Sequence, residues 1–464
     1  MKSIVISDTV EHDLCIGCGV CAAVCPDKIL EMRFNRFGEY NPFEIADCTK
    51  ECGLCLKVCP FTDGTPDEDA IGQLLFGEVP DIQHRSETGY FLEAFVGHSQ
   101  IDGHRERGSS GGMATWLLQT LLASKKVDAV VCVTSNPDPG KLFRFAVFAT
   151  AEEVRAASGS AYYPVELSEV LVYIIEHPGR YAVIGLPCFV KAIRLAQLRN
   201  RNLRERIVVV LGLVCGQLKS KHYTAYLAAL AGLESAPTQV HFRGKDPAQP
   251  AGNFYFSCRA QNGVERRLYW NSGVSEAWHN RWFTPMACNY CDDIFAEGAD
   301  VTFMDAWLPE YSGDSRGTNL AIVRSPQIRD VMRAGCDSGA LIGSDISIDE
   351  VISSQAGVIA KKRVDLVDRL YVAHRRRFQV PNKRVSMRPV GNPFRHWAIH
   401  RGEEMQQASH RNFADAIENG DFVCEIFRGS MTHHLNRMRL ARGISAGMIL
   451  PVRVAGRLRR YLHD

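Results

Sequence analysis

Short apolar runs alternate with helix-like stretches between residues 90 and 235. The strand-like runs are 95–97, 129–133, 145–149, 181–185 and 207–214, and apolar residues recur at helical spacing over 113–124 and 224–231. Short apolar runs bounded by turn residues are typical of buried strands. Because these strands alternate with helices, the pattern favours a layered α/β unit.

The pattern changes after residue 235. The runs VHFRG, FYFSCRA, VERRLYW, ADVTFMD and LAIVRS indicate strands of more antiparallel character, and helical spacing returns near Pro326. We therefore expect a second, α+β unit. The acidic stretch FTDGTPDEDA contains Gly and Pro and predicts a linker with a domain boundary near residue 80. These boundaries divide the chain into residues 1–79, 80–235, 236–380 and 381–464.

Length and composition agree with a multidomain globular protein. The chain has 464 residues, of which 46% are hydrophobic and 23% charged, and a domain takes roughly 150 residues. The longest apolar stretch, residues 207–215, is nine residues, against the roughly 20 of a membrane-spanning helix. The N-terminus lacks the apolar core of a secretory signal. We expect no transmembrane segment and a cytoplasmic location.

The charge is uneven along the chain. The formal net charge is +2, so the overall balance excludes the strongly basic class of nucleic-acid-binding proteins. Residues 375–464 hold 17 Lys and Arg against 7 Asp and Glu, a local charge of +10. The basic end, residues 451–462, predicts a solvated helix, with an amphipathic helix for an acidic partner or membrane surface as the alternative.

Cysteine spacing carries the clearest chemistry. Eight of the 16 cysteines fall within the first 60 residues, in two groups that each end in Cys-Pro. The first group has the C-x2-C-x2-C-x3-C-P spacing of bacterial two-cluster ferredoxins, in which the last cysteine ligates the other cluster. The sequence therefore predicts two [4Fe-4S] clusters, with these ligand sets: Cys15, Cys18, Cys21 and Cys59, and Cys48, Cys52, Cys55 and Cys25.

The second group departs from the usual spacing, because three residues instead of two separate Cys48 from Cys52. A pair of zinc sites is the alternative, although zinc needs only four ligands and no proline-terminated repeat. Gly17, Gly19 and Gly53 would let backbone amides approach the sulfurs.

Four further cysteines predict a third [4Fe-4S] cluster. Cys188 and Cys215 each follow a strand-like run, at the edge where open α/β sheets bind ligands. Cys288 and Cys291 form an isolated C-x2-C, which needs two more ligands. A structural zinc in the same cage and no metal at all are the alternatives. Cys132, Cys258, Cys336 and Cys424 read as ordinary small hydrophobes.

Two small-residue segments are candidates for cofactor binding. RGSSGG precedes a helical stretch, where Ser109 or Ser110 could cap the helix and the glycines would admit a phosphate. In ASGSAYY small residues would permit backbone contact, and the tyrosines could stack on an aromatic ring. An ordinary turn or loop is the alternative for each. Asp300 and Asp305 favour a turn or ribose contact over a metal, and no catalytic residue is assigned.

These residues together resemble a known family. The ferredoxin repeat followed by GSSGGMATWLL, GSAYY, GLPCFVKAIR, LVCG, CNYCDD, ADVTFMDAW and GTNLAIVRS is similar to the family of coenzyme F420 hydrogenase/dehydrogenase beta subunits, over roughly residues 10–335. The resemblance implies an α/β flavin-binding core and an iron-sulfur flavoprotein that binds FAD. It also implies FAD contacts and supports the third cluster. The implied cofactor-binding residues are Ser109, Ser110, Gly111, Gly112, Gly159, Ser160 and, as a cation facing the flavin, Lys191, whose alternative is a surface lysine.

The resemblance implies an oxidoreductase that joins hydride chemistry to one-electron transfer. The substrate is a deazaflavin coenzyme, F420, or an organic metabolite reduced with ferredoxin electrons. A non-catalytic electron-relay subunit or a metal-stapled binding module is the alternative. The expected partners are a ferredoxin or a partner oxidoreductase subunit and a small-molecule substrate, with no nucleic acid; a homo-oligomer stays open. The regular ferredoxin repeat counts against a chlorophyll substrate, and nothing resembles a nickel-iron site.

Overall fold

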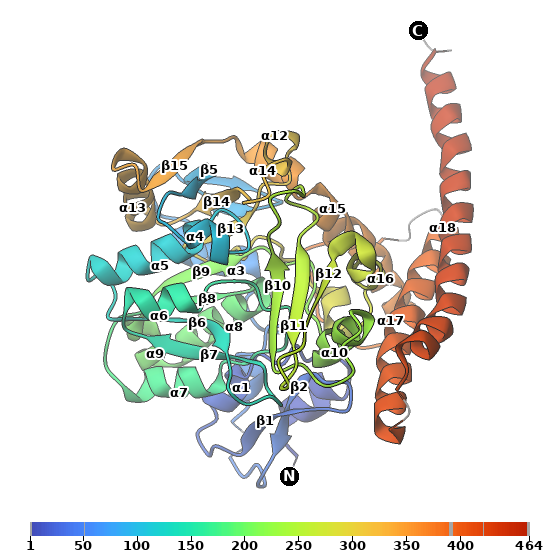
Figure 1. The fold of residues 1–464 in the computed structure, drawn as a ribbon, viewed down its shortest axis with the longest axis horizontal. Helices are drawn as coiled ribbons and strands as arrows, with labels where there is room; N and C mark the ends of the chain where they lie inside the picture. Colours follow the sequence, from blue (N-terminus) through green and yellow to red (C-terminus); the bar gives the residue numbers. More distant parts are fainter. Residues whose placement is uncertain (1, 51, 389–392, 421, 462–464) are drawn as a thin grey trace.

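The computed structural model describes residues 2–50, 52–388, 393–420 and 422–461. Its centre is a mixed eight-stranded sheet (Figure 1). In spatial order the strands are β15 (Leu341–Asp345), β5 (Glu93–Ser99), β14 (Asn319–Val323), β13 (Val301–Asp305), β9 (Ile207–Leu213), β8 (Tyr181–Gly185), β6 (Ala129–Ser135) and β7 (Phe143–Phe148).

The four inner strands, β13, β9, β8 and β6, run parallel to one another, whereas β7 and β14 flank them in antiparallel pairing. The predicted α/β layering is therefore confirmed, and the predicted runs at 181–185 and 207–214 agree with β8 and β9 to within one residue. The expectation of antiparallel character in ADVTFMD is half right. This run forms β13, which pairs in parallel with β9 and in antiparallel with β14.

The large sheet takes strands from both sides of residue 235. β13, β14 and β15 come from the segment that the sequence assigned to a second unit, and they join strands from the first. Four of the five residues of β13 and all five of β14 are buried. Strands with this burial need neighbours on both edges and cover on both faces. The boundaries proposed from the sequence stay predictions.

Helices cover both faces of this sheet. Val130 and Val131 are consecutive in β6, yet Val130 packs with α5 and α13 whereas Val131 packs with α7 and α8. This alternation is the period of two expected of a strand between two helical layers. The helices involved are α5 (Met113–Ala123), α6 (Ala151–Ala156), α7 (Ser168–Glu176), α8 (Pro187–Arg199), α9 (Arg201–Arg206) and α13 (Pro326–Asp337).

The N-terminal segment forms a small module that packs against the large sheet's helical layer. It contains an antiparallel pair and two short helices, each of which contains one of the predicted cysteine ligands. Its elements are η1 (Ile6–Val10), α1 (Val20–Ala23), β1 (Leu30–Phe34), β2 (Tyr40–Glu44) and α2 (Leu54–Lys57). The sequence repeat thus corresponds to a repeated backbone feature, a short helix that contains one cysteine of each group. α3 (Glu68–Phe76), β3 (Gln83–Arg85) and β4 (Gly89–Phe91) connect the module to β5.

A second, three-stranded antiparallel sheet stands beside the large one. Its strands, β10 (Gln239–Gly244), β11 (Tyr255–Arg259) and β12 (Glu265–Tyr269), confirm the antiparallel reading of VHFRG, FYFSCRA and VERRLYW. The remaining core elements are α4 (His104–Arg107), α10 (Lys221–Leu230), η2 (Trp270–Ser272), α11 (Val274–His279), η3 (Met286–Tyr290), α12 (Pro309–Ser312), α14 (Ile348–Ser354), α15 (Ala356–Ile359), η4 (Ala360–Val364) and α16 (Asp365–Arg375).

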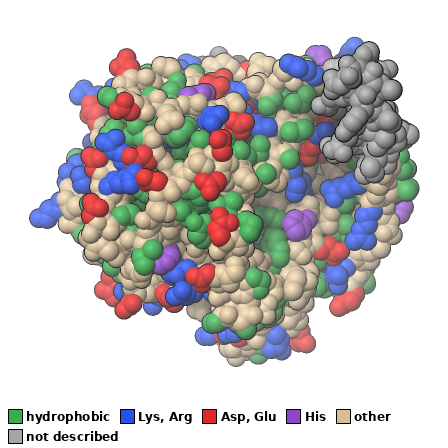
Figure 2. Space-filling model, turned by 90° about the horizontal axis from the view of Figure 1, so that it is seen from above, with side chains coloured by type: hydrophobic (Ala, Val, Ile, Leu, Met, Phe, Trp, Pro, Cys, Tyr) green, Lys and Arg blue, Asp and Glu red, His purple; other side chains and the backbone are tan. Residues whose placement is uncertain are grey.

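The C-terminal extension is a pair of long helices, α17 (Pro393–Asn419) and α18 (Cys424–Tyr461). Met405, Phe413 and Phe427 are buried in the same hydrophobic cluster as α10, whereas the end of α18 projects beyond the body of the molecule (Figure 1). The side chains of residues 446–461 lie outside the described part, so both readings of the basic end remain open. Charged side chains of both signs are mixed over the face in Figure 2. Within the described residues, no helix is long and apolar enough to cross a membrane.

Candidate iron-sulfur centres and cofactor loops

The first predicted ligand set is brought together in the N-terminal module. Burial raises the pKa of the Cys15 thiol to about 12, and the neighbouring Cys59 contributes to the rise. Burial likewise raises the pKa of Cys21, and Cys18, Cys15 and Cys59 all add to it by charge repulsion. The Gly17 amide donates to the Cys15 sulfur over 3.4 Å, as expected of backbone that approaches a cluster thiolate. Four thiols that each oppose the others' ionisation fit a positively charged iron-sulfur core.

The cysteines of the second predicted ligand set are less buried than those of the first. Burial raises the pKa of Cys55, with Cys52 as a charged neighbour, and Lys50 lies within electrostatic reach of Cys52 and Cys25. Cys25 and Cys48 pack, with Cys55, on the hydrophobic cluster under the module, whereas Cys52 is exposed. Cys52 follows the extra residue that the spacing revealed, so the irregularity in sequence coincides with the solvent-facing end of this set.

The third set also converges. Cys188 lies in the first turn of α8 directly after β8, Cys215 follows β9, and Cys288 and Cys291 lie within and directly after η3. Burial raises the pKa of Cys188 well above its usual value, and Cys291, Cys215 and Cys288 each add to the rise. Because β8 and β9 are parallel, their carboxyl ends bring the first two thiols to one edge of the sheet. The tertiary fold brings the other two thiols, those of Cys288 and Cys291, to the same place.

No three His, Cys, Asp or Glu side chains of the described residues converge on a single point as the ligands of one metal ion do. In a [4Fe-4S] cluster each thiolate binds a different iron, so the four sulfurs surround the cluster instead of one atom. The donor sets of four thiols fit such clusters by their chemistry.

A buried cation lies at the third set. Lys362 in η4 donates to the Cys291 sulfur and to the Asp293 carbonyl oxygen, both over 3.0 Å, and its side chain is 5% exposed. The Leu218 amide donates to the Cys288 sulfur over 3.4 Å. Sequence reasoning missed Lys362, because the run AKKRV reads as a solvated charge cluster. Its contact with a thiol is known only from the fold.

Lys191 lies between the N-terminal module and the core. Its ammonium pairs with the Glu68 carboxylate at 3.2 Å, and both side chains are buried, so the alternative of a surface lysine is wrong. Its charge also lowers the pKa of Cys59, against the larger effect of burial. Arg384 pairs with Glu297 at 2.6 Å in the same buried network. The structure therefore places Lys191 beside the first cysteine set.

The RGSSGG loop is held by β14 rather than by its own serines. Gly112, with φ of +79°, is the N-cap of α5, and no side chain of the loop caps the helix. The expected serine cap is therefore wrong, because Asn319 Oδ1 accepts from the Met113 amide at 3.1 Å. The Ser110 hydroxyl instead donates to the Thr318 carbonyl oxygen at 2.8 Å. The Ser109 hydroxyl is buried and has no hydrogen-bond partner among the described residues.

The second candidate loop lies against the first. A Cβ added to Gly159 would stand 3.6 Å from the Arg107 carbonyl oxygen and 3.9 Å from His241 Nε2. Ser160 hydrogen-bonds to Tyr162 in this loop. Tyr162 packs against Phe242 and Trp278 of the protein itself, and its stacking on a ligand ring stays a prediction. Segments that are about fifty residues apart in sequence thus lie side by side.

Cations surround the loops. The Lys245 ammonium donates to the backbone oxygens of Ser110 (2.8 Å), Arg316 (2.5 Å) and Arg105. Burial lowers the pKa of Lys245 to about 7, and Arg243 lowers it further. Arg243 pairs with both oxygens of Asp305, at 2.7 and 3.1 Å. A backbone loop under buried cations suits an anionic group such as a phosphate.

The two aspartates of ADVTFMD have structural partners. Asp300 pairs with Arg194 at 2.9 Å and accepts from the Val210 amide at 2.7 Å. Asp305 pairs with Arg243. Their partners are arginines and an amide, in agreement with the preference for a non-metal role.

Comparison with known proteins defines the class first. A 4Fe-4S dicluster domain model matches residues 14–62, so the N-terminal module is an iron-sulfur domain. The models of the coenzyme F420 hydrogenase/dehydrogenase beta subunit, N-terminal and C-terminal, match residues 94–172 and 179–348. The chain belongs to this oxidoreductase family, which confirms the resemblance seen in its motifs.

Two curated relatives are linked by name to the same coenzyme. One subunit of the F(420)H(2) dehydrogenase of Methanosarcina mazei is 26% identical over 229 residues, which are 48% of this chain and 58% of the relative. Coenzyme F420-dependent sulfite reductase of Methanocaldococcus jannaschii is 24% identical over 194 residues, which are 41% of this chain and 26% of the relative. The chain thus spans about half or less of these relatives' length. A chain of the F420-reducing [NiFe] hydrogenase complex from Methanosarcina barkeri aligns at 16% identity with a TM-score of 0.48, over 62% of this chain and 96% of that one.

Proposed function

We propose that this chain is an electron-transfer oxidoreductase that couples FAD-dependent hydride chemistry to one-electron transfer through three [4Fe-4S] clusters. Bound FAD supplies the means to exchange a hydride with a substrate and single electrons with a cluster. The proposed substrate is coenzyme F420, which appears in the names of both relatives, or an organic metabolite.

The observation that carries this proposal is a hydrophobic cluster against which members of both the first and the third cysteine sets pack. Cys59, Cys188 and Cys291 all pack against one hydrophobic cluster, which contains Leu14, Phe61, Ala287, Tyr290, Leu366, Leu370 and Ala373. Lys191 lies on the same helix as Cys188 and within electrostatic reach of Cys59. Two cysteine sets that pack against the same hydrophobic cluster favour an electron path between the core and the N-terminal module.

The loops at 109–112 and 159–160 would hold the FAD. Two observations support this: the loops adjoin each other, and Lys245 supplies positive charge for a diphosphate. The unpartnered Ser109 hydroxyl is available to a ligand oxygen.

At the clusters the chain's own residues would compensate charge. Lys362 places an ammonium against Cys291, and the amides of Gly17 and Leu218 donate to sulfurs of the first and third sets. Such donors stabilise thiolate charge and tune the potential of a bound cluster.

A cavity of about 610 Å³ beside Cys15 is where the first set meets solvent, and it is the proposed exit for electrons to an external carrier. The carrier is a ferredoxin or a partner oxidoreductase subunit. A non-catalytic relay subunit is the second candidate, supported by the relative that is named a subunit. We propose a cytoplasmic location, and a homo-oligomer stays open.

Iron and flavin content of anaerobically purified protein tests the proposal. We expect about 12 irons and one FAD per chain, at four irons per cluster. About 8 irons would contradict the third cluster. Absence of flavin after reconstitution with FAD would contradict the reductase and leave the relay.

A further inference from the structure

A cavity of about 300 Å³ lies between the core and the C-terminal helices. Residues from α16, α17 and α18 line it, together with Arg281 and Asn289 of the core. Its volume suits a small ligand. Most of its wall comes from residues beyond 348, where the match to the family ends, so the family relationship assigns nothing to it.

Arg281 is the core residue whose buried donors indicate which kind of ligand this cavity would bind. Its Nε and Nη2 atoms are buried and have no hydrogen-bond partner among the described residues. Arg369 Nε, a donor of another cavity-lining residue, is buried without a hydrogen-bond partner as well, and so is the acceptor Asn289 Oδ1. Leaving a buried charged donor without a hydrogen bond costs the free energy of its desolvation. A ligand with acceptor oxygens would satisfy the arginine donors.

The charge around the cavity is unbalanced. Arg395 is neutralised by Asp365 at 2.8 Å and by Asp368 at 2.9 Å. Among the described residues, the ion pair of Arg369 with Glu403 is long, at 4.0 Å, and its Nη1 donates to the Lys361 carbonyl oxygen at 3.2 Å.

The other cations lack such partners. Burial lowers the pKa of Arg281 to about 10, and the charge of Arg369 lowers it further. Burial and the neighbouring cations, Arg281 among them, lower the pKa of Lys361 beside the cavity. Cations that disfavour one another's charge are stabilised when an anion lies between them.

We propose that this cavity binds a small organic oxyanion, a carboxylate or a phosphate, with the Arg281 guanidinium as its central contact. The planar fork of arginine donates two parallel hydrogen bonds to either group. Arg281 also lies within electrostatic reach of Cys288 and Cys215, so the anion would be held on the far side of Arg281 from the third cysteine set. This proposal concerns binding and does not depend on the proposed redox function.

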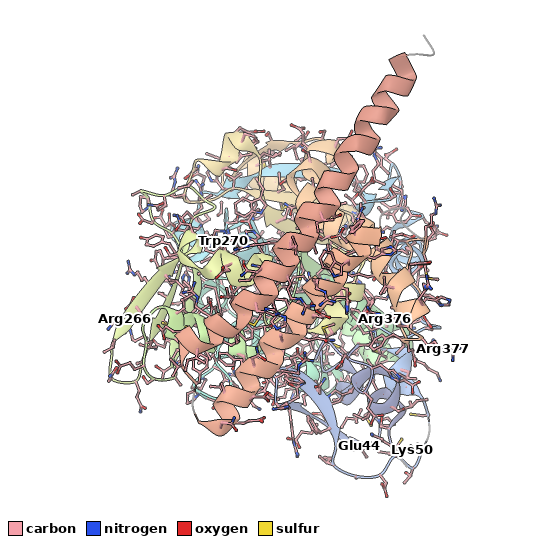
Figure 3. The ribbon with its side chains drawn as sticks, turned by 90° about the vertical axis from the view of Figure 1, so that its right-hand side faces the viewer. Glu44, Lys50, Arg266, Trp270, Arg376 and Arg377 are labelled. Atoms are coloured by element: carbon pink, nitrogen blue, oxygen red, sulfur yellow. The ribbon has the colours of Figure 1, made fainter. Side chains whose placement is uncertain are left out.

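Calorimetric titration of the anaerobically purified holoprotein tests it, with inorganic phosphate and succinate as separate probes. We expect one-to-one binding of at least one probe, and the stronger of the two identifies the group recognised. Arg281→Gln should weaken binding about tenfold or more, the loss of roughly one charged hydrogen bond. Arg266→Gln is the matched control, because Arg266, labelled in Figure 3, is exposed on β12 and is not among the residues that line the cavity. If neither probe binds, or if Arg281→Gln binds as the control does, the proposal is overturned.

A second pair of variants avoids the buried arginine. Gly402 lines the cavity from α17, and a Cβ added there meets nothing within 4 Å. Gly402→Glu places a carboxylate at the wall, and Gly402→Gln adds nearly the same volume without charge. Both replace glycine in a helix by a better helix former, so folding is preserved. We expect the glutamate variant to bind at least about tenfold more weakly than the glutamine variant; equal affinities would overturn the proposal.

Discussion

At the proposed third cluster, the single side chain of Lys362 would influence the reduction potential. It is buried and donates to a thiol of the third cysteine set. A reduced cluster carries one more negative charge than an oxidised one, so a nearby ammonium favours the reduced state.

We expect Lys362→Met to lower the midpoint potential of the third cluster by about 60 mV, equivalent to a tenfold change for a one-electron couple. Potentiometric titration followed by electron paramagnetic resonance measures this. Lys361→Met is the neighbouring control, because Lys361 is more exposed than Lys362 and donates to no cysteine sulfur among the described residues. Iron content confirms that both variants are loaded. An unchanged potential in Lys362→Met would contradict the charge argument.

Lys245 would make the proposed flavin loop sensitive to pH. Its pKa is lowered to about 7 by burial first, then by Arg243 and Arg105, while Asp305 and Glu106 act in the opposite direction. Above pH 7 the folded protein increasingly holds Lys245 neutral. We expect the affinity for FAD to fall as pH rises from about 6 to 8, as measured by flavin fluorescence. Lys245→Arg should flatten the profile, and a flat wild-type profile would contradict the assignment.

The residues that the sequence could identify are those with a spacing signal. The spacing of the proline-terminated cysteines predicted the two N-terminal ligand sets. The positions of Cys188 and Cys215 after strand-like runs predicted them as further ligands. Lys362 has no such signal, because it reaches Cys291 from 71 residues away in the sequence. Arg281 lies only seven residues before Cys288, but no spacing signal marks it. The predicted role of Lys191 toward a flavin remains a prediction, and its ion pair with Glu68 depends on a module–core contact that periodicity does not encode.

Among the elements, the turn into α5 depends on close backbone contact. A Cβ on Gly111 would stand 2.8 Å from the Gly97 carbonyl oxygen and 2.9 Å from the Asn319 amide nitrogen. Since both atoms belong to strands of the central sheet, they cannot move independently of it.

We expect Gly111→Ala to destabilise the protein by about 1–3 kcal/mol and to weaken flavin retention. Urea unfolding and bound-flavin absorbance measure the two effects. Gly429→Ala in α18 is the control, because its Cβ meets nothing and alanine favours a helix by up to about 1 kcal/mol. Equal stability of the two variants would show that the loop can yield.

The residue ranges of the strands were predicted better than their neighbours in the sheet. The range of β8 agreed with its apolar run because a strand buried on both faces is a continuous apolar segment. Its neighbours could not be read in the same way. β13 carries the same kind of run but lies between β9 and β14. Its pairing with β9 depends on packing between segments about ninety residues apart in the chain.

At the scale of the whole molecule, the Lys191–Glu68 pair ties the core to the segment that follows the N-terminal module. Removing one partner of a buried pair leaves the other charge uncompensated, at a cost of about 3–5 kcal/mol. We therefore expect Lys191→Met to loosen the module and slow electron transfer between the clusters. Limited proteolysis between residues 60 and 80 and stopped-flow reduction measure this.

The double variant Lys191→Met with Glu68→Gln provides the matched comparison, because it removes both charges. It should recover part of the lost stability. A double variant as unstable as the sum of its single changes would show that the two residues act independently.

β5 has only β14 and β15 as sheet neighbours within the described residues. Both of these strands follow β5 by more than two hundred residues. During synthesis the ribosome therefore releases β5 long before either partner exists, and the chain must hold an unpaired apolar strand for all that time. A fragment that stops at residue 235 would present β5 and one edge of β9 as open templates for aggregation. Assembly of this molecule is thus a late event, completed only when residues 301–345 have emerged.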